Sequence, residues 1–257
     1  MADQVEPSPE PEEHDTRARF AEWMEKNAGD PASPPIAAST VILLRDSDSG
    51  PEVLMMHRTS SIAFGGAWVF PGGKLDPEDY AASGTDPGSA ADAIEASRHA
   101  AVREAMEEGG ITIDLDELVA HSHWMPPPVA PKRFSTWFFI APATDEDVVV
   151  DQGEITEHAW MRPADALQKQ REREIELAPP TWVTLHGLCD VSSVEEALTR
   201  SATQLVPFYA TSVGRLGDDP VALWHGDAAY ETGDTSLEGG RHRLIMQRGG
   251  WRFEHSS

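Results

Sequence analysis

Cysteine, basic side chains and long apolar runs are all scarce in this chain of 257 residues. The single cysteine, Cys189, cannot form an internal disulfide, so we expect a reducing, cytoplasmic environment and interpret Cys189 as a small buried side chain. No apolar stretch approaches the roughly 20 residues that span a bilayer. The 20 Lys and Arg residues against 44 Asp and Glu leave a net charge of −24. This charge argues against nonspecific binding of nucleic acid or anionic membrane.

The N-terminal region also lacks the features of a secretion signal, because "MADQVEPSPEPEEHD" is acidic and rich in proline. We therefore expect residues 1–16 to form a disordered acidic tail. No internal repeat divides the remainder, so residues 17–257 are predicted to form a single domain. Its mixture of strands with a few helices favours an α/β or α+β sandwich built on a mixed β-sheet.

Local patterns place the elements along the chain. Residues 16–29 predict a short amphipathic helix with Phe20 and Trp23 on one face. The next segments predict a hairpin of strands at 40–44 and 52–58 and a short strand at 67–70. A polar loop is predicted at 75–90 and a helix at about 91–108. The rest predicts strands at 117–125, 133–142 and 155–161, three helices between 162 and 201, and β-structure from 204 that ends in a hairpin around Gly249 and Gly250.

The stretch "REAMEEGG" concentrates like charge on one helix, because Glu104 lies three and four residues from Glu107 and Glu108. Such like-charge pairs each cost roughly 0.2–0.5 kcal/mol. The three glutamates share a sector of about 100°, and the apolar residues Val102, Ala105 and Met106 are predicted to lie opposite them. Converging carboxylates suit Mg²⁺ or Mn²⁺, which prefer hard oxygen ligands. The alternative is a solvated acidic face.

Two short motifs resemble a known family. "REAMEEGGI", residues 103–111, resembles the second half of the Nudix box, REUxEExGU with U aliphatic, and departs from it only at Ala105. "FPGG", residues 70–73, resembles the entrance to that box. The usual box has a Glu six residues after its first Gly, whereas here Glu95 lies 22 residues after Gly73, which implies an insertion of 16 residues at about 76–91. Asp79 lies six residues after Gly73, where an uninterrupted box would have its Glu, and we assign it only a supporting role.

An interrupted box of this kind resembles a Nudix subgroup that includes the peroxisomal coenzyme A diphosphatases of animals. "HWMPPPVAPKRFSTWFFIAP", "GEITEHAWMRPADAL" and "APPTWVTLHGL" resemble further landmarks of that subgroup. The similarity covers roughly residues 36–255. It implies a Nudix-like sandwich with a C-terminal extension over about 165–257.

The resemblance also implies a reaction, the hydrolysis of a nucleoside diphosphate derivative with Mg²⁺ or Mn²⁺. Matched to the family motif, Glu104, Glu107, Glu108 and the Gly72 carbonyl are metal ligands. Arg103 lies beside Glu107 on the helix and is expected to orient the carboxylates by hydrogen bonding. Glu154 is the first candidate for general base and Glu157 the second, and activation of the water by Glu104 itself stays open.

Rare basic residues are candidates for binding substrate phosphates. These are Lys132 and Arg133, which precede a predicted aromatic strand, and Arg58 at the end of another. A plain solubilising pair is the alternative for the first two. The aromatic side chains of Trp68, Phe70, Trp137 and Phe138 are candidates for stacking an adenine, although strand aromatics more often belong to the core.

The substrate predicted from the subgroup is coenzyme A or acyl-coenzyme A. The upstream signature of the shorter coenzyme A pyrophosphatases has an arginine where this chain has Ile62. An ADP-ribose, dinucleotide or nucleotide-sugar diphosphate is therefore the second substrate class, and a ligand-sensing module without turnover is the alternative of another kind. The expected partner is a small molecule, and a homodimer is left open.

Overall fold

The computed structural model describes residues 15–26, 32–59, 65–86, 90–144, 147–150 and 153–256. The predicted acidic tail lies outside these ranges except for its last two residues, and Thr16 already belongs to helix α1 (Thr16–Lys26). None of the helices in the described ranges is long and apolar enough to cross a membrane.

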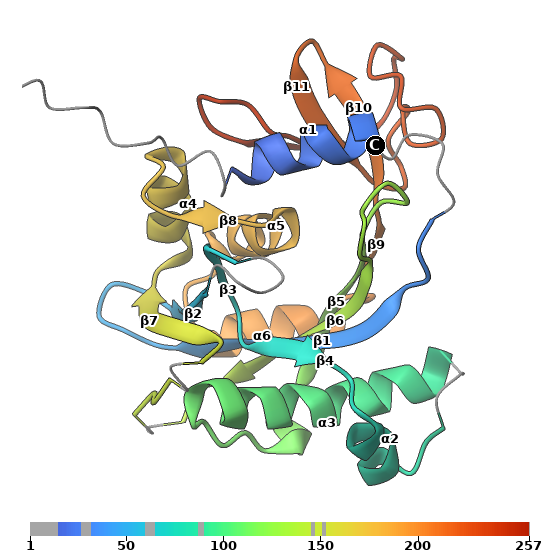
Figure 1. Ribbon diagram of the computed structural model, residues 1–257. Coiled ribbons are helices and arrows are strands. Elements are labelled where there is room, and N and C mark those ends of the chain that lie inside the picture. The colour runs from blue at the N-terminus through green and yellow to red at the C-terminus, as the bar shows by residue number, and fades with distance from the viewer. Residues whose placement is uncertain are drawn as a thin grey trace, which may run out of the picture.

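A mixed sheet forms the centre of the molecule (Figure 1). Within the described residues it has nine strands, and seven of them follow the order β8-β3-β2-β1-β6-β5-β9, while β4 pairs with β1 and β7 with β2. The bounds of the strands are β1 Ile36–Arg45, β2 Glu52–Arg58, β3 Ala67–Val69, β4 Gly72–Lys74, β5 Val119–Met125, β6 Phe134–Pro142, β7 Ile155–Met161, β8 Glu176–Leu177 and β9 Phe208–Ala210.

A second, smaller sheet is built from the C-terminal strands in the order β10-β11-β12-β13, all antiparallel. These strands are β10 Ser212–Leu216, β11 Asp219–Leu223, β12 Arg241–Ile245 and β13 Arg252–Ser256. The hairpin predicted around Gly249 and Gly250 is therefore confirmed as β12–β13. Apolar residues of this sheet, such as Ala222 and Leu244, join the core of the large sheet.

Helices lie on both faces of the large sheet, and two apolar clusters fill the spaces between (Figure 1). Helix α3 (Ala90–Gly109) packs against one face, where Ala101 and Ala105 meet the strands. The other face carries α1, α5 (Pro179–Leu188), α6 (Val194–Thr203) and the second sheet. The described elements also include helix α4 (Pro163–Arg171) and the 3₁₀ turn η2 (Leu115–Glu117). The predicted sandwich is confirmed.

The residues expected to form a polar loop contain a helix instead, α2 (Pro77–Ser83). Asp76 is its N-cap, Pro77 occupies the first turn, and the Asp79 side chain accepts a hydrogen bond from the Asp76 N–H at 2.8 Å. Gly84 ends the helix in the left-handed conformation, with φ of 69°. These are ordinary helix start and stop signals, so the sequence contained the information that the loop prediction overlooked.

Gly72 and Gly73, which follow the predicted short strand at 67–70, begin a further strand, β4, and pair with Thr40 and Ser39 of β1. Two further predictions need correction. Met106 does not belong to a buried face and is 46% exposed. Cys189 is exposed at the C-terminal end of α5 rather than buried.

Candidate active site

The buried stripe of helix α3 is lined by small side chains and then by a carboxylate. Ala101 and Ala105 are fully buried against the sheet, and Glu108, one turn further along, is only 4% exposed. Glu108 therefore lies on the same side of the helix as the buried alanines, whereas the sequence analysis placed the glutamates opposite Ala105. Glu107 is exposed. Alanine allows the helix to approach the sheet closely, which brings the glutamates against the edge formed by β4.

Glu108 is held tightly at one oxygen and poorly at the other. Its Oε2 accepts a hydrogen bond from the Gly72 N–H at 2.9 Å. Its Oε1 is buried without a hydrogen-bond partner and has only a distant ion pair with Arg58, at 3.4 Å. Burial raises the pKa of Glu108 to about 7, against the opposing effects of Arg58 and the Gly72 N–H. This oxygen is a site where a cation would be favourable.

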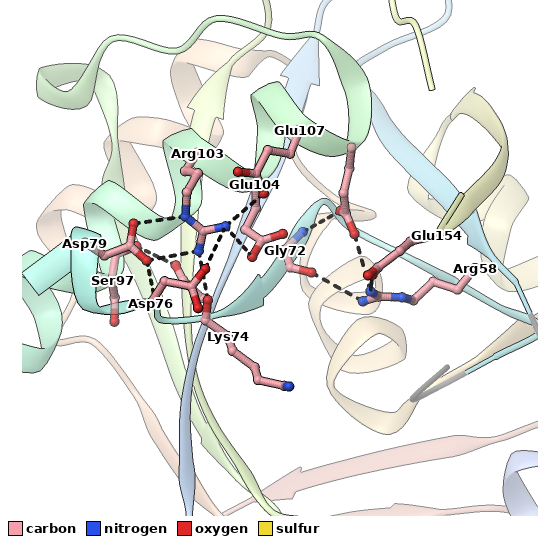
Figure 2. Close-up of polar contacts among 12 residues, drawn as sticks. Arg58, Gly72, Lys74, Asp76, Asp79, Ser97, Arg103, Glu104, Glu107 and Glu154 are labelled. Atoms are coloured by element: carbon pink, nitrogen blue, oxygen red, sulfur yellow. Dashed lines mark hydrogen bonds and ion pairs between the residues drawn. The ribbon is translucent and has the colours of Figure 1, made fainter. Parts of the chain in front are cut away.

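Arg103 lies at the centre of a second group of polar contacts, next to those of Glu108 (Figure 2). It donates to Glu104 Oε1 and Glu107 Oε2, each at 2.9 Å, to both oxygens of Asp79 at 3.1 and 2.9 Å, and to the Lys74 carbonyl at 2.9 Å. These are hydrogen bonds of the kind expected for an orienting arginine. Burial also raises the pKa of Glu104, although Arg103 opposes the change. Asp79 reaches Arg103 because α2 packs against α3.

The two glycines of the "FPGG" motif allow this close approach. A Cβ added at Gly73 would lie 2.2 Å from Glu104 Oε1, and one at Gly72 would lie 2.2 Å from Thr40 Oγ1. Real Cβ atoms are not found at such distances. A larger residue at Gly73 would therefore displace the Glu104 carboxylate, and one at Gly72 would clash with Thr40 and the Ser39 carbonyl of β1. The glycines are therefore required by space and not by an unusual φ angle.

Arg58 bridges the helix, the glycine loop and the segment that precedes β7 (Figure 2). Its guanidinium donates to Glu154 Oε2 at 2.8 Å and to the Gly72 carbonyl at 3.3 Å. Glu154 is 59% exposed and lines the same cavity as the α3 glutamates. The structure thus joins Arg58 and Glu154, which are 96 residues apart, and sequence reasoning had no signal for their contact.

The remaining candidates divide between the cavity and other places. Lys132 lines the cavity. Arg133 does not, and its guanidinium donates instead to the backbone carbonyls of Pro126 and Ser33, each at 3.2 Å. Glu157 lies exposed on β7, and Glu95 is exposed beside Arg98, so neither reaches the carboxylate cluster.

The four aromatic candidates separate in the same way. Phe70 and Phe138 are buried and line the cavity, with their ring centroids 6.2 Å apart. Trp68 packs against His57, and Trp137 stacks on His123 with centroids 4.4 Å apart. Neither tryptophan lines the cavity. Their positions fit a packing role.

The cavity itself has a volume of about 710 Å³. This lies within the range of small-molecule sites, which are clefts of roughly 300–1,000 Å³. One end is formed by the α3 glutamates with Arg58, Gly72 and Arg103. Residues of α1, β5 and β6, the start of α5, and Trp224, which follows β11, line the remainder. Sequence reasoning did not foresee that α1 and Trp224 contribute.

The donor set fits a hard divalent cation. Carboxylates and a backbone carbonyl are the ligands that Mg²⁺ and Mn²⁺ prefer, and Glu108 Oε1 is a buried oxygen without a hydrogen-bond partner. No three His, Cys, Asp or Glu side chains in the described ranges already form a metal shell. Two guanidiniums, of Arg58 and Arg103, contact the carboxylates instead.

The arrangement of a mixed sheet, a glutamate-bearing helix and a glycine loop is the one that the sequence resemblance implied for a hydrolase of diphosphates. Residues 34–180, more than half of the chain, match the family model described as the NUDIX domain. The chain belongs to the NUDIX family.

Individual relatives are more distant. The chain is 30% identical over 80 residues to the acyl-coenzyme A diphosphatase NUDT19 of Xenopus laevis, a match that covers 29% of this chain and only 21% of that protein's length. A NUDIX hydrolase from Alicyclobacillus acidocaldarius has a similar fold, with a TM-score of 0.59 and 21% identity over 65% of this chain and 96% of that one. The NUDIX domain of Shewanella oneidensis NrtR, complexed with ADP ribose, has a TM-score of 0.43 and 17% identity over 70% and 97%.

Proposed function

We propose that this protein is a metal-dependent diphosphohydrolase that cleaves the pyrophosphate bond of coenzyme A or acyl-coenzyme A. The observation that carries the proposal is that Glu104, Glu107, Glu108 and Gly72 line one large cavity, in which the Gly72 N–H donates to Glu108. The choice of coenzyme A is supported by the partial match to an acyl-coenzyme A diphosphatase and by the interrupted Nudix box.

The proposal assigns the metal, Mg²⁺ or Mn²⁺, to Glu104, Glu107, Glu108 and the Gly72 carbonyl. When bound, such a metal offsets the charge of the diphosphate and lowers the pKa of a coordinated water. The raised pKa of Glu108 fits this assignment, because a site that penalises a bare carboxylate gains most from a neighbouring cation.

The chain's own residues position the reactants. Glu154 is proposed to accept the proton of the attacking water. Its ion pair with Arg58 holds the Glu154 carboxylate at the end of the cavity where the metal is proposed to bind. Glu104 remains the alternative base. Arg103 holds Glu104 and Glu107 in place. Lys132 is proposed to bind a substrate phosphate, whereas the backbone contacts of Arg133 give that residue a structural role.

A substrate panel tests the proposal. Coenzyme A, acyl-coenzyme A, ADP-ribose, a diadenosine polyphosphate and a nucleotide sugar would each be incubated with Mg²⁺ or Mn²⁺, with EDTA as the control. For coenzyme A we expect 3′,5′-ADP and 4′-phosphopantetheine, identified by mass. Preferred turnover of ADP-ribose, a dinucleotide or a nucleotide sugar would overturn the substrate assignment, and the absence of any product would favour the sensing alternative.

A further inference from the structure

The cavity extends well beyond the carboxylates, and its far wall comes from outside the segment that matches the family. Phe20 and Trp23 of α1 line it, as does Trp224 at the end of β11. The family match covers residues 34–180, so neither element belongs to it. The non-family parts of the chain thus complete the wall of the same cavity that holds the α3 glutamates.

Helix α1 is fastened in this position by charged contacts at both ends. Arg17 donates to the Met246 carbonyl at 3.0 Å and pairs with Asp219 at 3.1 Å. Near the other end, Arg215 of the second sheet pairs with Glu25 at 2.9 Å. Between these anchors, Phe20 is buried and Trp23 is half-buried, with their ring centroids 6.1 Å apart. The apolar side of α1 is therefore a fixed part of the cavity wall.

The polar groups at this end are already used inside the protein. The indole N–H of Trp124 donates to Ser122 Oγ at 2.9 Å, and that of Trp224 donates to Thr211 Oγ1 at 3.0 Å. The hydroxyl groups of Thr136 and Thr211, which also line the cavity, donate to the Phe134 and Tyr209 carbonyls. Arg19 of α1 also lines the cavity, and its guanidinium donates to Thr16 Oγ1 at 3.4 Å. Beside it, Phe20, Trp23 and Trp224 line the cavity with aromatic side chains.

Such a surface distinguishes an alkyl chain from a second sugar. A ribose or hexose placed against it would lose hydrogen bonds to water without replacing them, which costs free energy. An alkyl chain would instead bury apolar surface. The wall therefore suits the acyl chain of a thioester and does not suit a second sugar.

We infer that Phe20 and Trp23 of α1, with Trp224, form a subsite for an alkyl or acyl chain on the non-nucleotide side of the diphosphate. The inference rests on the proposed function only in placing the diphosphate at the α3 glutamates. It makes α1 a determinant of specificity, so the enzyme prefers acylated to free coenzyme A.

Calorimetric binding in EDTA tests this without turnover, with coenzyme A and dodecanoyl-coenzyme A as ligands at concentrations below micelle formation. Each buried CH₂ strengthens binding by up to about fourfold, so we expect the acylated ligand to bind at least about tenfold more tightly, with one ligand per chain. Trp23→Ala should reduce this preference by about fivefold, and Trp23→Phe should retain most of it. Met24→Ala is the matched control, because Met24 packs against the same core from α1 but does not line the cavity.

Equal affinity of the native protein for both ligands would overturn the inference, as would a Trp23→Ala variant that keeps the full preference or a Met24→Ala variant that loses it equally. The outcome is separate from that of the proposed function. Hydrolysis of coenzyme A without any chain preference would refute the subsite alone. A preference that depends on Trp23 in a protein that hydrolyses nothing would refute the proposed function alone.

Discussion

Two clusters of arginine and carboxylate in this molecule differ in how well their charges are matched. In the second sheet, Arg243 and Asp227 form a pair that is 3% and 0% exposed at the side chains. Arg243 Nη2 and Nε each donate to the carboxylate at 2.6 Å, and the N–H groups of Ala229 and His242 donate at 2.8 and 2.9 Å. Both oxygens of Asp227 are satisfied, and these hydrogen bonds keep its pKa below the ordinary value despite burial.

The cluster at α3 has the opposite balance. Arg58 and Arg103 are the cations that contact its carboxylates in the described structure, and they face more carboxylates than they can neutralise (Figure 2). Glu108 keeps a buried oxygen without a hydrogen bond, and its burial raises its pKa. A purely structural ion pair is saturated, as at Asp227, whereas a site that receives a cation keeps oxygen donors in reserve.

The largest expected effect is a loss of turnover when carboxylates of the α3 cluster are substituted. Glu107→Gln and Glu108→Gln should each lower kcat by about a hundredfold or more, because each removes a charged oxygen donor from the metal end. Glu95→Gln is the control, since Glu95 is on the same helix but exposed away from the cavity. Circular dichroism would verify that the variants fold. Native rates in Glu108→Gln would disprove its assignment as a ligand.

Stability should respond in the reverse order. Asp227→Asn should lower the free energy of unfolding by about 3–5 kcal/mol, because it leaves the buried Arg243 without its counter-charge. Denaturant unfolding would measure this, with Asp218→Asn, in an exposed turn of the same sheet, as the control. Glu108→Gln, measured in EDTA at pH 8, should be neutral or stabilising. A loss at Glu108 as large as that at Asp227 would show that the two clusters do not differ in this way.

The smallest expected effect is on the pH dependence of stability. Folding raises the pKa of Glu108 from the ordinary 4.5 to about 7, so the folded state binds the proton more strongly than the unfolded state. Its contribution to stability is complete below about pH 4.5 and is lost as the pH rises through about 7. In EDTA, the melting temperature of the native protein should fall from pH 5 to pH 8 more steeply than that of Glu108→Gln.

Saturating Mg²⁺ should oppose that fall, because metal binding favours the deprotonated carboxylate and stabilises the folded state by mass action. The same thermal melts would show it as a Mg²⁺-dependent rise in melting temperature that is larger at pH 8 than at pH 5. Parallel pH profiles for the native protein and Glu108→Gln would contradict the raised pKa.

Much of the fold follows from local patterns in the sequence. The aromatic and β-branched run at Phe134–Pro142 forms β6, and the run of good helix formers closed by Gly109 and Gly110 forms α3. The capping signals at Asp76 and Pro77 were also local, and reading them would have placed α2. Local patterns could not predict the parallel pairing of β1 with β6, because nearly a hundred residues separate the paired residues.

The sequence alone determined that three glutamates share one helix sector and that two glycines precede them, because helical spacing and motif order are properties of neighbouring residues. Tertiary structure alone decided that Arg58 meets Glu154 and that Glu108 is buried against Gly72. It also decided that α1 and Trp224, which follows β11, line the cavity. These contacts depend on how closely an alanine-lined helix packs on the sheet and on where a distant second sheet docks. Both are set by long-range packing, which no local periodicity encodes.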